Sequence, residues 1–175
     1  VKPVMWSSVF IIDPLYTVWL LIACVVAWFA RERKLAQPAL VVGLALSSLY
    51  LGGSLWAKAR VEHEAETALA KLGLEDAPRF SVPMPFNTLL WRVVAMTPDG
   101  FVEGERSLVA DRGPMQFRAY ASDVQAYNQV SGYPAVHRLN WFNHGFMKAE
   151  QRDGRLIVTA LRMGAEPDYS FRFAV

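Results

Sequence analysis

The chain has 175 residues, of which 53% are hydrophobic and 19% charged, and its formal net charge is +2. The residues after Ala57 contain 14 basic and 14 acidic side chains, so that part is formally neutral. It lacks the basic field that nucleic-acid binding requires, and we therefore expect no nucleic-acid partner. The single cysteine, Cys24, excludes an intrachain disulfide and a thiolate metal cluster.

Two uncharged runs, residues 14–30 and 35–57, lie near the start of the chain and are separated by residues 31–34. A helix of about 20 apolar residues crosses a hydrocarbon core of roughly 30 Å. The pattern predicts a membrane region over residues 1–57, with transmembrane helices at about 14–30 and 36–57 and a lipid bilayer as partner. Asp13 followed by Pro14 is typical of a helix start, with aspartate as the N-cap.

The second run carries small residues at helical spacing, Gly43 with Ser47 and Ser48 with Gly52. Such pairs allow close approach of helix backbones in lipid, although a tolerant apolar sequence also produces them. A bundle of two helices is small. We therefore expect further transmembrane helices as partners, from other sequence or from another chain.

The orientation in the membrane follows from the charges beside the runs. Arg31, Arg33 and Lys34 favour a cytoplasmic loop, which places the rest of the chain on the periplasmic side. Lys58 and Arg60, beyond the second run, indicate the opposite orientation. We expect the periplasmic side.

An amphipathic pattern continues over residues 58–73, with Val61, Ala65, Ala68 and Leu72 on one helical face. This predicts a helical stalk that extends the second membrane helix into water and ends at Gly73. Prolines 78, 83 and 85 then predict an extended linker.

Residues 79–175 predict an extramembrane α+β domain. Asp99–Gly100 and Asp153–Gly154 are each flanked by β-type runs, which predicts two hairpins. Short helices are expected at about 122–130 and 134–142. The predicted fold class is α+β: a two-helix transmembrane hairpin and helical stalk, followed by a small antiparallel β-sheet domain with two short helices.

The residues carry few signals of catalysis. His63, His137 and His144 do not have the spacing of a ligand set, so we expect no metal site within this chain. Glu103 and Glu105 alternate on a strand and are expected on a solvated face. A surface ion-pair group is expected near the end of the chain, formed by Arg162, Glu166, Asp168 and Arg172.

Two places remain as candidate sites. Asp13 is a possible catalytic acid at the membrane boundary, and the alternative is a plain N-cap. Asn87, Trp91 and Arg92 form a candidate binding group at the start of a strand. The simpler interpretation makes Trp91 a core residue and Arg92 a surface or ion-paired residue.

Several segments together carry a family resemblance. FIIDPLYT (10–17), PMPFNTLLWRVV (83–94), the Asp99–Gly100 turn with its following SLV, and RMGAEPDYSFRF (162–173) resemble the bacterial membrane-bound metal-dependent hydrolase family. Some members of this family of inner-membrane hydrolases are described as LexA-binding.

The resemblance implies a divalent metal held by His- and Asp-containing motifs in N-terminal membrane helices, and none of those motifs occurs in this sequence. It therefore implies that the chain corresponds to the C-terminal half of such a hydrolase, and that this part alone is inactive. Asp13 is the acid that the resemblance places nearest the missing site. The alternative from another class is a non-catalytic, membrane-anchored binding or regulatory module.

Overall fold

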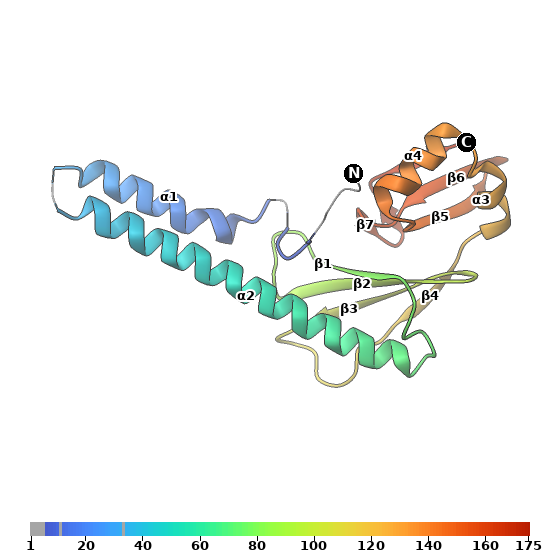
Figure 1. Ribbon diagram of the computed structural model, residues 1–175, viewed down its shortest axis with the longest axis horizontal. Coiled ribbons are helices and arrows are strands. Elements are labelled where there is room, and N and C mark those ends of the chain that lie inside the picture. Colours follow the sequence, from blue (N-terminus) through green and yellow to red (C-terminus); the bar gives the residue numbers. More distant parts are fainter. Residues whose placement is uncertain (1–5, 11, 33) are drawn as a thin grey trace.

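A computed structural model describes residues 6–10, 12–32 and 34–175 (Figure 1). These residues form helices and antiparallel sheets, which confirms the predicted α+β class. The helices are α1 (Pro14–Phe29), α2 (Ala36–Ala70), α3 (Val124–Val130) and α4 (Pro134–Asn143). The strands are β1 (Arg79–Pro83), β2 (Leu90–Thr97), β3 (Gly100–Ser107), β4 (Arg118–Ala121), β5 (Met147–Arg152), β6 (Arg155–Ala160), β7 (Gly164–Ala165), β8 (Asp168–Tyr169) and β9 (Arg172–Ala174). Residues 1–5 and 11 of the predicted membrane region, and Arg33 of the basic loop, lie outside the described residues.

Helices α1 and α2 form an antiparallel hairpin that projects away from the sheets (Figure 1). A Cβ placed on Gly43 would lie 2.2 Å from the Cβ of Ala23, so the two helices are in close contact there. One turn further, the Ser47 hydroxyl donates to the Tyr16 carbonyl at 3.2 Å. The interpretation of Gly43 and Ser47 as a packing pair is confirmed. A Cβ on Gly52 would meet no atom of the described residues within 4 Å, so that position is not used in the hairpin.

The prediction of two membrane-spanning helices needs correction. Among the described helices, only α2 has the length and apolar composition of a span, whereas α1 is apolar but has 16 residues. At 1.5 Å per residue α1 is about 24 Å long, short of a hydrocarbon core. Asp13 and Pro14 fix its first turn, and the chain leaves the helix at Ala30 for the charged turn.

The segment predicted as a stalk is the continuous second half of α2, and its apolar face lies on a sheet rather than in water. Ala57, Val61, Ala65 and Ala68 pack with Trp91 in one buried cluster. Gly73, at φ 70°, ends the helical region as predicted. Leu72 is exposed, and Leu69 occupies the buried position instead.

Strands β1 to β4 form the first sheet, in that order and all antiparallel. The segment around Pro83, predicted to be a linker, is the edge strand β1, where a proline is tolerated because one side of the strand needs no partner. Strand β2 is buried on both faces. Trp91 and Val93 face α2, whereas Val94 packs with Leu161 of the C-terminal part.

The C-terminal part adds a second sheet, β5-β6-β9, and a two-stranded sheet, β7-β8, where one small sheet was expected. Both Asp–Gly hairpins are confirmed: β2 pairs with β3, and β5 with β6. Asp153 and Gly154 have φ values of 52° and 72°, as a tight two-residue hairpin turn requires. Helices α3 and α4 were predicted at nearly these bounds, and their apolar side chains pack on β5 and β6.

Candidate functional site

The first candidate site is a hydrogen-bonded cluster where the helix hairpin meets the first sheet. We call Asp13, Tyr50, Thr88 and Trp91 the junction cluster. The Tyr50 hydroxyl lies 2.8 Å from Asp13 Oδ2, to which it donates, and 3.0 Å from Thr88 Oγ1. Trp91 Nε1 donates to the Thr88 carbonyl at 2.8 Å. Three segments that lie far apart in the sequence therefore meet in one hydrogen-bonded cluster.

Asp13 is buried and acts as the N-cap of α1. Its Oδ1 accepts from the backbone N–H groups of Leu15 at 3.0 Å and Tyr16 at 3.3 Å. Its Oδ2 accepts from Tyr50, so both carboxylate oxygens have protein donors. Asp13 is thus the N-cap of α1, as predicted, and it also forms a bridge to α2 that the sequence did not reveal. Tyr50 is the residue in the sequence that could have indicated this bridge, because a phenolic hydroxyl in an apolar run needs a hydrogen-bond partner.

Of the predicted binding group, Trp91 belongs to the junction cluster and Asn87 lies next to Thr88 in the chain, and both have structural roles. Asn87 Oδ1 accepts from the N–H groups of Leu89 at 2.7 Å and Leu90 at 3.3 Å, which shapes the turn into β2. Trp91 is fully buried against α2, in agreement with the core interpretation.

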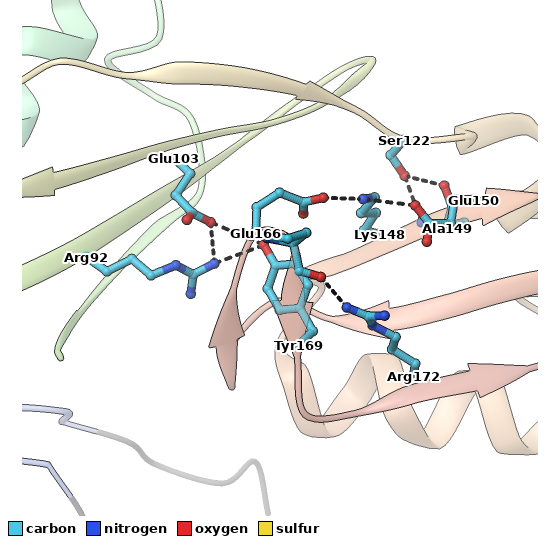
Figure 2. Close-up of polar contacts among 10 residues, drawn as sticks. Arg92, Glu103, Ser122, Lys148, Ala149, Glu150, Glu166, Tyr169 and Arg172 are labelled. Atoms are coloured by element: carbon cyan, nitrogen blue, oxygen red, sulfur yellow. Dashed lines mark hydrogen bonds and ion pairs between the residues drawn. The ribbon is translucent and has the colours of Figure 1, made fainter. Parts of the chain in front are cut away.

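Arg92 lies on the opposite face of β2 and does not join the junction cluster. It forms a second site, the Arg92 cluster, with Glu103 and Tyr169 (Figure 2) and with the Leu161 carbonyl. Its Nη2 lies 2.5 Å from Glu103 Oε2 and 3.1 Å from the Tyr169 hydroxyl, and its Nη1 donates to the Leu161 carbonyl at 2.8 Å. Arg92 is only 1% exposed. The ion-paired interpretation is confirmed and the surface location is wrong.

Glu103 also differs from its predicted position on a solvated face. It shares a face with Glu105, as expected, but it is buried beneath the C-terminal part, where Tyr169 also donates to it at 3.2 Å. The alternation of the strand predicted the shared face. It could not predict that a second sheet would cover one end of that face.

The surface ion pairs predicted among Arg162, Glu166, Asp168 and Arg172 do not occur in the described part of the chain, where Glu166 pairs with Lys148 and Arg172 donates to the Pro167 carbonyl. Glu166 Oε1 accepts from Lys148 Nζ at 2.9 Å, and Glu150 lies 3.0 Å from the same ammonium (Figure 2). Burial lowers the pKa of Lys148, but hydrogen bonds to these two carboxylates outweigh burial, and the pKa lies above its ordinary value. Arg162 lies over the Phe80 ring at 5.6 Å.

Tyr169 has the largest electrostatic shift in the Arg92 cluster. Burial raises the pKa of its hydroxyl far above the ordinary value of 10.0, Arg92 opposes the shift, and Glu103 and Glu166 add to it. The hydroxyl therefore stays protonated at physiological pH and can donate to Glu103. A neutral donor beside a fixed ion pair is suited to holding two sheets together.

A cavity of about 270 Å³ opens beside this cluster. Its lining comes from β3, from β4 and the segment before it, and from the segment before β8, and consists of Glu103, Gly104, Glu105, Gln116, Arg118, Tyr120 and Glu166. The lining side chains are acids and hydrogen-bonding groups without a nucleophile paired to a base.

The described residues do not fit a resident divalent metal. No group of three or more His, Cys, Asp or Glu side chains among them is placed to hold an ion. His63 lies on α2, whereas His137 lies on α4 and His144, seven positions further along the chain, caps the C-terminal end of the same helix. Asp13 uses both oxygens for protein donors. We therefore derive no chemical step through a metal in this chain.

Comparison with protein-family models, with curated proteins and with solved structures gives no match for this chain.

Proposed function

We propose that this chain is the C-terminal, membrane-anchoring part of a bacterial membrane-bound metal-dependent hydrolase, located in the inner membrane with residues 79–175 on the periplasmic side. The proposal assigns the metal ligands to other segments of the intact protein. It keeps Asp13 as the acid of this chain nearest that site.

One observation carries the proposal: the separate segments that resemble the family lie together in the fold. The Phe10 and Phe86 rings are 5.7 Å apart, and the junction cluster joins Asp13 to Thr88. Arg92 reaches Tyr169 at 3.1 Å, which links the second segment to the last. Sequence segments that contact one another in the fold are more consistent with a family architecture than with chance similarity of unrelated segments.

We propose further that α2 crosses the membrane and that the shorter α1, packed against it, lies in the apolar layer without spanning it. No charged residue occurs in either apolar run, and Trp28 lies at the end of α1, where an interfacial anchor is expected. Because α1 is short, we place its start below the level of the bilayer surface, with Asp13 shielded by the junction cluster. The open face at Gly52 is available to partner helices.

The second candidate function is a non-catalytic, membrane-anchored binding or regulatory module. Two observations support it. The described residues contain no group placed to hold a metal, and both carboxylate oxygens of Asp13 accept hydrogen bonds from the protein. The cavity beside Glu103 would then be the contact surface for a partner.

Metal content and hydrolysis by the purified full-length protein distinguish the two functions. The hydrolase predicts a bound divalent metal by elemental analysis, and phosphoester or lipid-type hydrolysis that a chelator removes. Asp13→Asn should lower this activity more than Asp123→Asn, a matched change at the N-cap of α3. A metal-free protein that hydrolyses neither class of substrate would establish the binding module instead.

A further inference from the structure

The loop between β1 and β2 reaches down to the apolar part of α2. Thr88 Oγ1 lies 3.0 Å from the Tyr50 hydroxyl. Tyr50 precedes Ala57, the last residue of the uncharged run, by seven positions, which is about 10 Å along a helix. Lys58 is the first charged residue after that run. The loop therefore lies beside the helix at a level where the helix carries no charge.

This loop, residues 84–89, presents apolar side chains outward. Phe86 is 61% exposed and Leu89 is 51% exposed. Phe86 has φ 58°, a left-handed conformation that bulky residues rarely adopt. The backbone is thus held in an unfavourable conformation at a residue whose ring is not buried in the protein core. In water such exposure forfeits about 25 cal/mol per Å² of apolar surface.

Several polar groups of the loop are hydrogen-bonded within the protein. Asn87 N–H donates to the Met84 carbonyl at 3.2 Å, and the Met84 N–H donates to the Leu90 carbonyl at 2.9 Å. The Asn87 side chain and the Thr88 carbonyl have the partners described above. No charged residue occurs from Phe80 to Trp91. A loop with internal hydrogen bonds and no charge can leave water at small cost.

The apolar surface continues from the loop onto the helices. Leu15, in the first turn of α1, is exposed, as is Leu49, next to Tyr50 on α2. Trp56 lies under the Arg60 guanidinium at 5.8 Å, an arrangement suited to the boundary between lipid and water. Figure 1 shows the loop beside the chain segment that enters α1, at the end of the hairpin nearest the sheets.

We propose that residues 84–89 form a membrane-insertion loop, whose Phe86 and Leu89 side chains enter the boundary between headgroups and acyl chains of the bilayer. The lipid surface is the occupant because the loop is uncharged and continuous with the exposed apolar surface of the hairpin. Interfacial segments typically bury apolar groups 5–10 Å deep, which matches the level of Tyr50. This inference rests on the membrane placement proposed above.

Depth-dependent fluorescence quenching tests the inference. The full-length protein, with Cys24→Ala as background, receives an environment-sensitive label at Phe86→Cys or, separately, Leu89→Cys. Each form is placed in nanodiscs of phosphatidylcholine and phosphatidylglycerol that contain acyl-chain spin labels. Asp99→Cys, at the opposite end of the β2–β3 hairpin, is the control for an aqueous position. Val42→Cys, exposed in the middle of the apolar run, reports the membrane span.

We expect a several-fold larger loss of fluorescence at positions 86 and 89 than at 99, from spin labels near the headgroups. Iodide serves as the quencher dissolved in the water phase. If the labels at positions 86 and 89 are quenched only by iodide, or neither by iodide nor by the spin labels, the insertion of the loop is disproved. Quenching at Val42 with no quenching at the loop refutes this inference alone. An unquenched label at Val42 refutes the membrane placement, and the inference with it.

Discussion

At the scale of single residues, Arg92 is the most consequential side chain of the domain. It is almost fully buried and its guanidinium is held by a carboxylate, a phenol and a carbonyl from three different elements. A buried ion pair adds little net stability over a well-packed apolar pair, but loss of one partner leaves the other charge uncompensated. Removal of Arg92 should therefore cost more stability than the ion pair itself contributes, because Glu103 would be left as a buried charge without its partner.

Arg92→Met should destabilise the fold by about 3–5 kcal/mol, because Glu103 would keep a buried charge without its partner. The measurement is urea unfolding of the detergent-solubilised protein by near-UV circular dichroism. The double variant Arg92→Met with Glu103→Leu should recover part of the loss, since no orphaned charge remains. A single variant as stable as the parent would show that water already reaches the pair.

Tyr169 predicts a dependence of stability on alkaline pH. Its folded-state pKa is raised above the unfolded value of 10.0, so its contribution is complete below about pH 10 and declines as the pH rises further. The free energy of unfolding should fall by up to about 1.4 kcal/mol per pH unit from this group. Tyr169→Phe should remove that part of the slope between about pH 9 and 11. An identical slope in both proteins would contradict the burial of this hydroxyl.

At the scale of elements, the α1–α2 contact depends on one small residue. Gly43 lies so close to Ala23 that no side chain fits without movement of a helix, whereas Gly52 faces open space among the described residues. The two glycines are nine positions apart on the same helix and thus form a matched pair of substitution sites.

Gly43→Ala should separate the helices and destabilise their contact by about 1–3 kcal/mol, the usual cost of overpacking. Faster hydrogen exchange of the α1 amides measures the effect. Gly52→Ala should leave exchange unchanged or slightly slower, because alanine favours helix. Ala23→Gly in the Gly43→Ala background should restore part of the protection. Equal effects of the two alanine substitutions would argue against the observed register.

At the scale of the whole molecule, two bodies built from separate stretches of chain are joined by one mixed apolar and polar contact. The first comprises α2 and strands β1–β4, and the second comprises the C-terminal helices and sheets. Phe80 of β1 is central to the contact, since its ring lies 4.7 Å from that of Phe146 and 5.8 Å from the Arg92 guanidinium. The Arg92 cluster supplies the polar part of the same contact between the two bodies.

Phe80→Ala should selectively weaken the contact between the two bodies. We expect faster hydrogen exchange in β5 and β6, with the helix hairpin unaffected, because α1 and the first half of α2 contact neither Phe80 nor Phe146 through a described cluster. Phe142→Ala, at a half-exposed ring on α4, is the matched control and should change exchange little. Uniform loss of protection over the whole chain would mean that the two bodies unfold as one unit.

Much of this architecture could be predicted from local pattern. The two Asp–Gly hairpins, the Asp13 N-cap, the end of the long helix at Gly73 and the core position of Trp91 each depend on a few neighbouring residues. Turn geometry, capping and two-residue alternation act over short distances, so the sequence alone carries their signal.

Only the tertiary structure decided which faces would be covered. The segment after Ala57 became the support of a sheet instead of a free stalk, because a sheet face was available to bury Val61 and Ala65. Glu103 and Arg92 became a buried pair because β6 and β8 cover that side of β2 and β3. Burial depends on contacts between residues far apart in the chain, with separations such as the 69 positions between Arg92 and Leu161. A local sequence pattern cannot encode the choice among such partners.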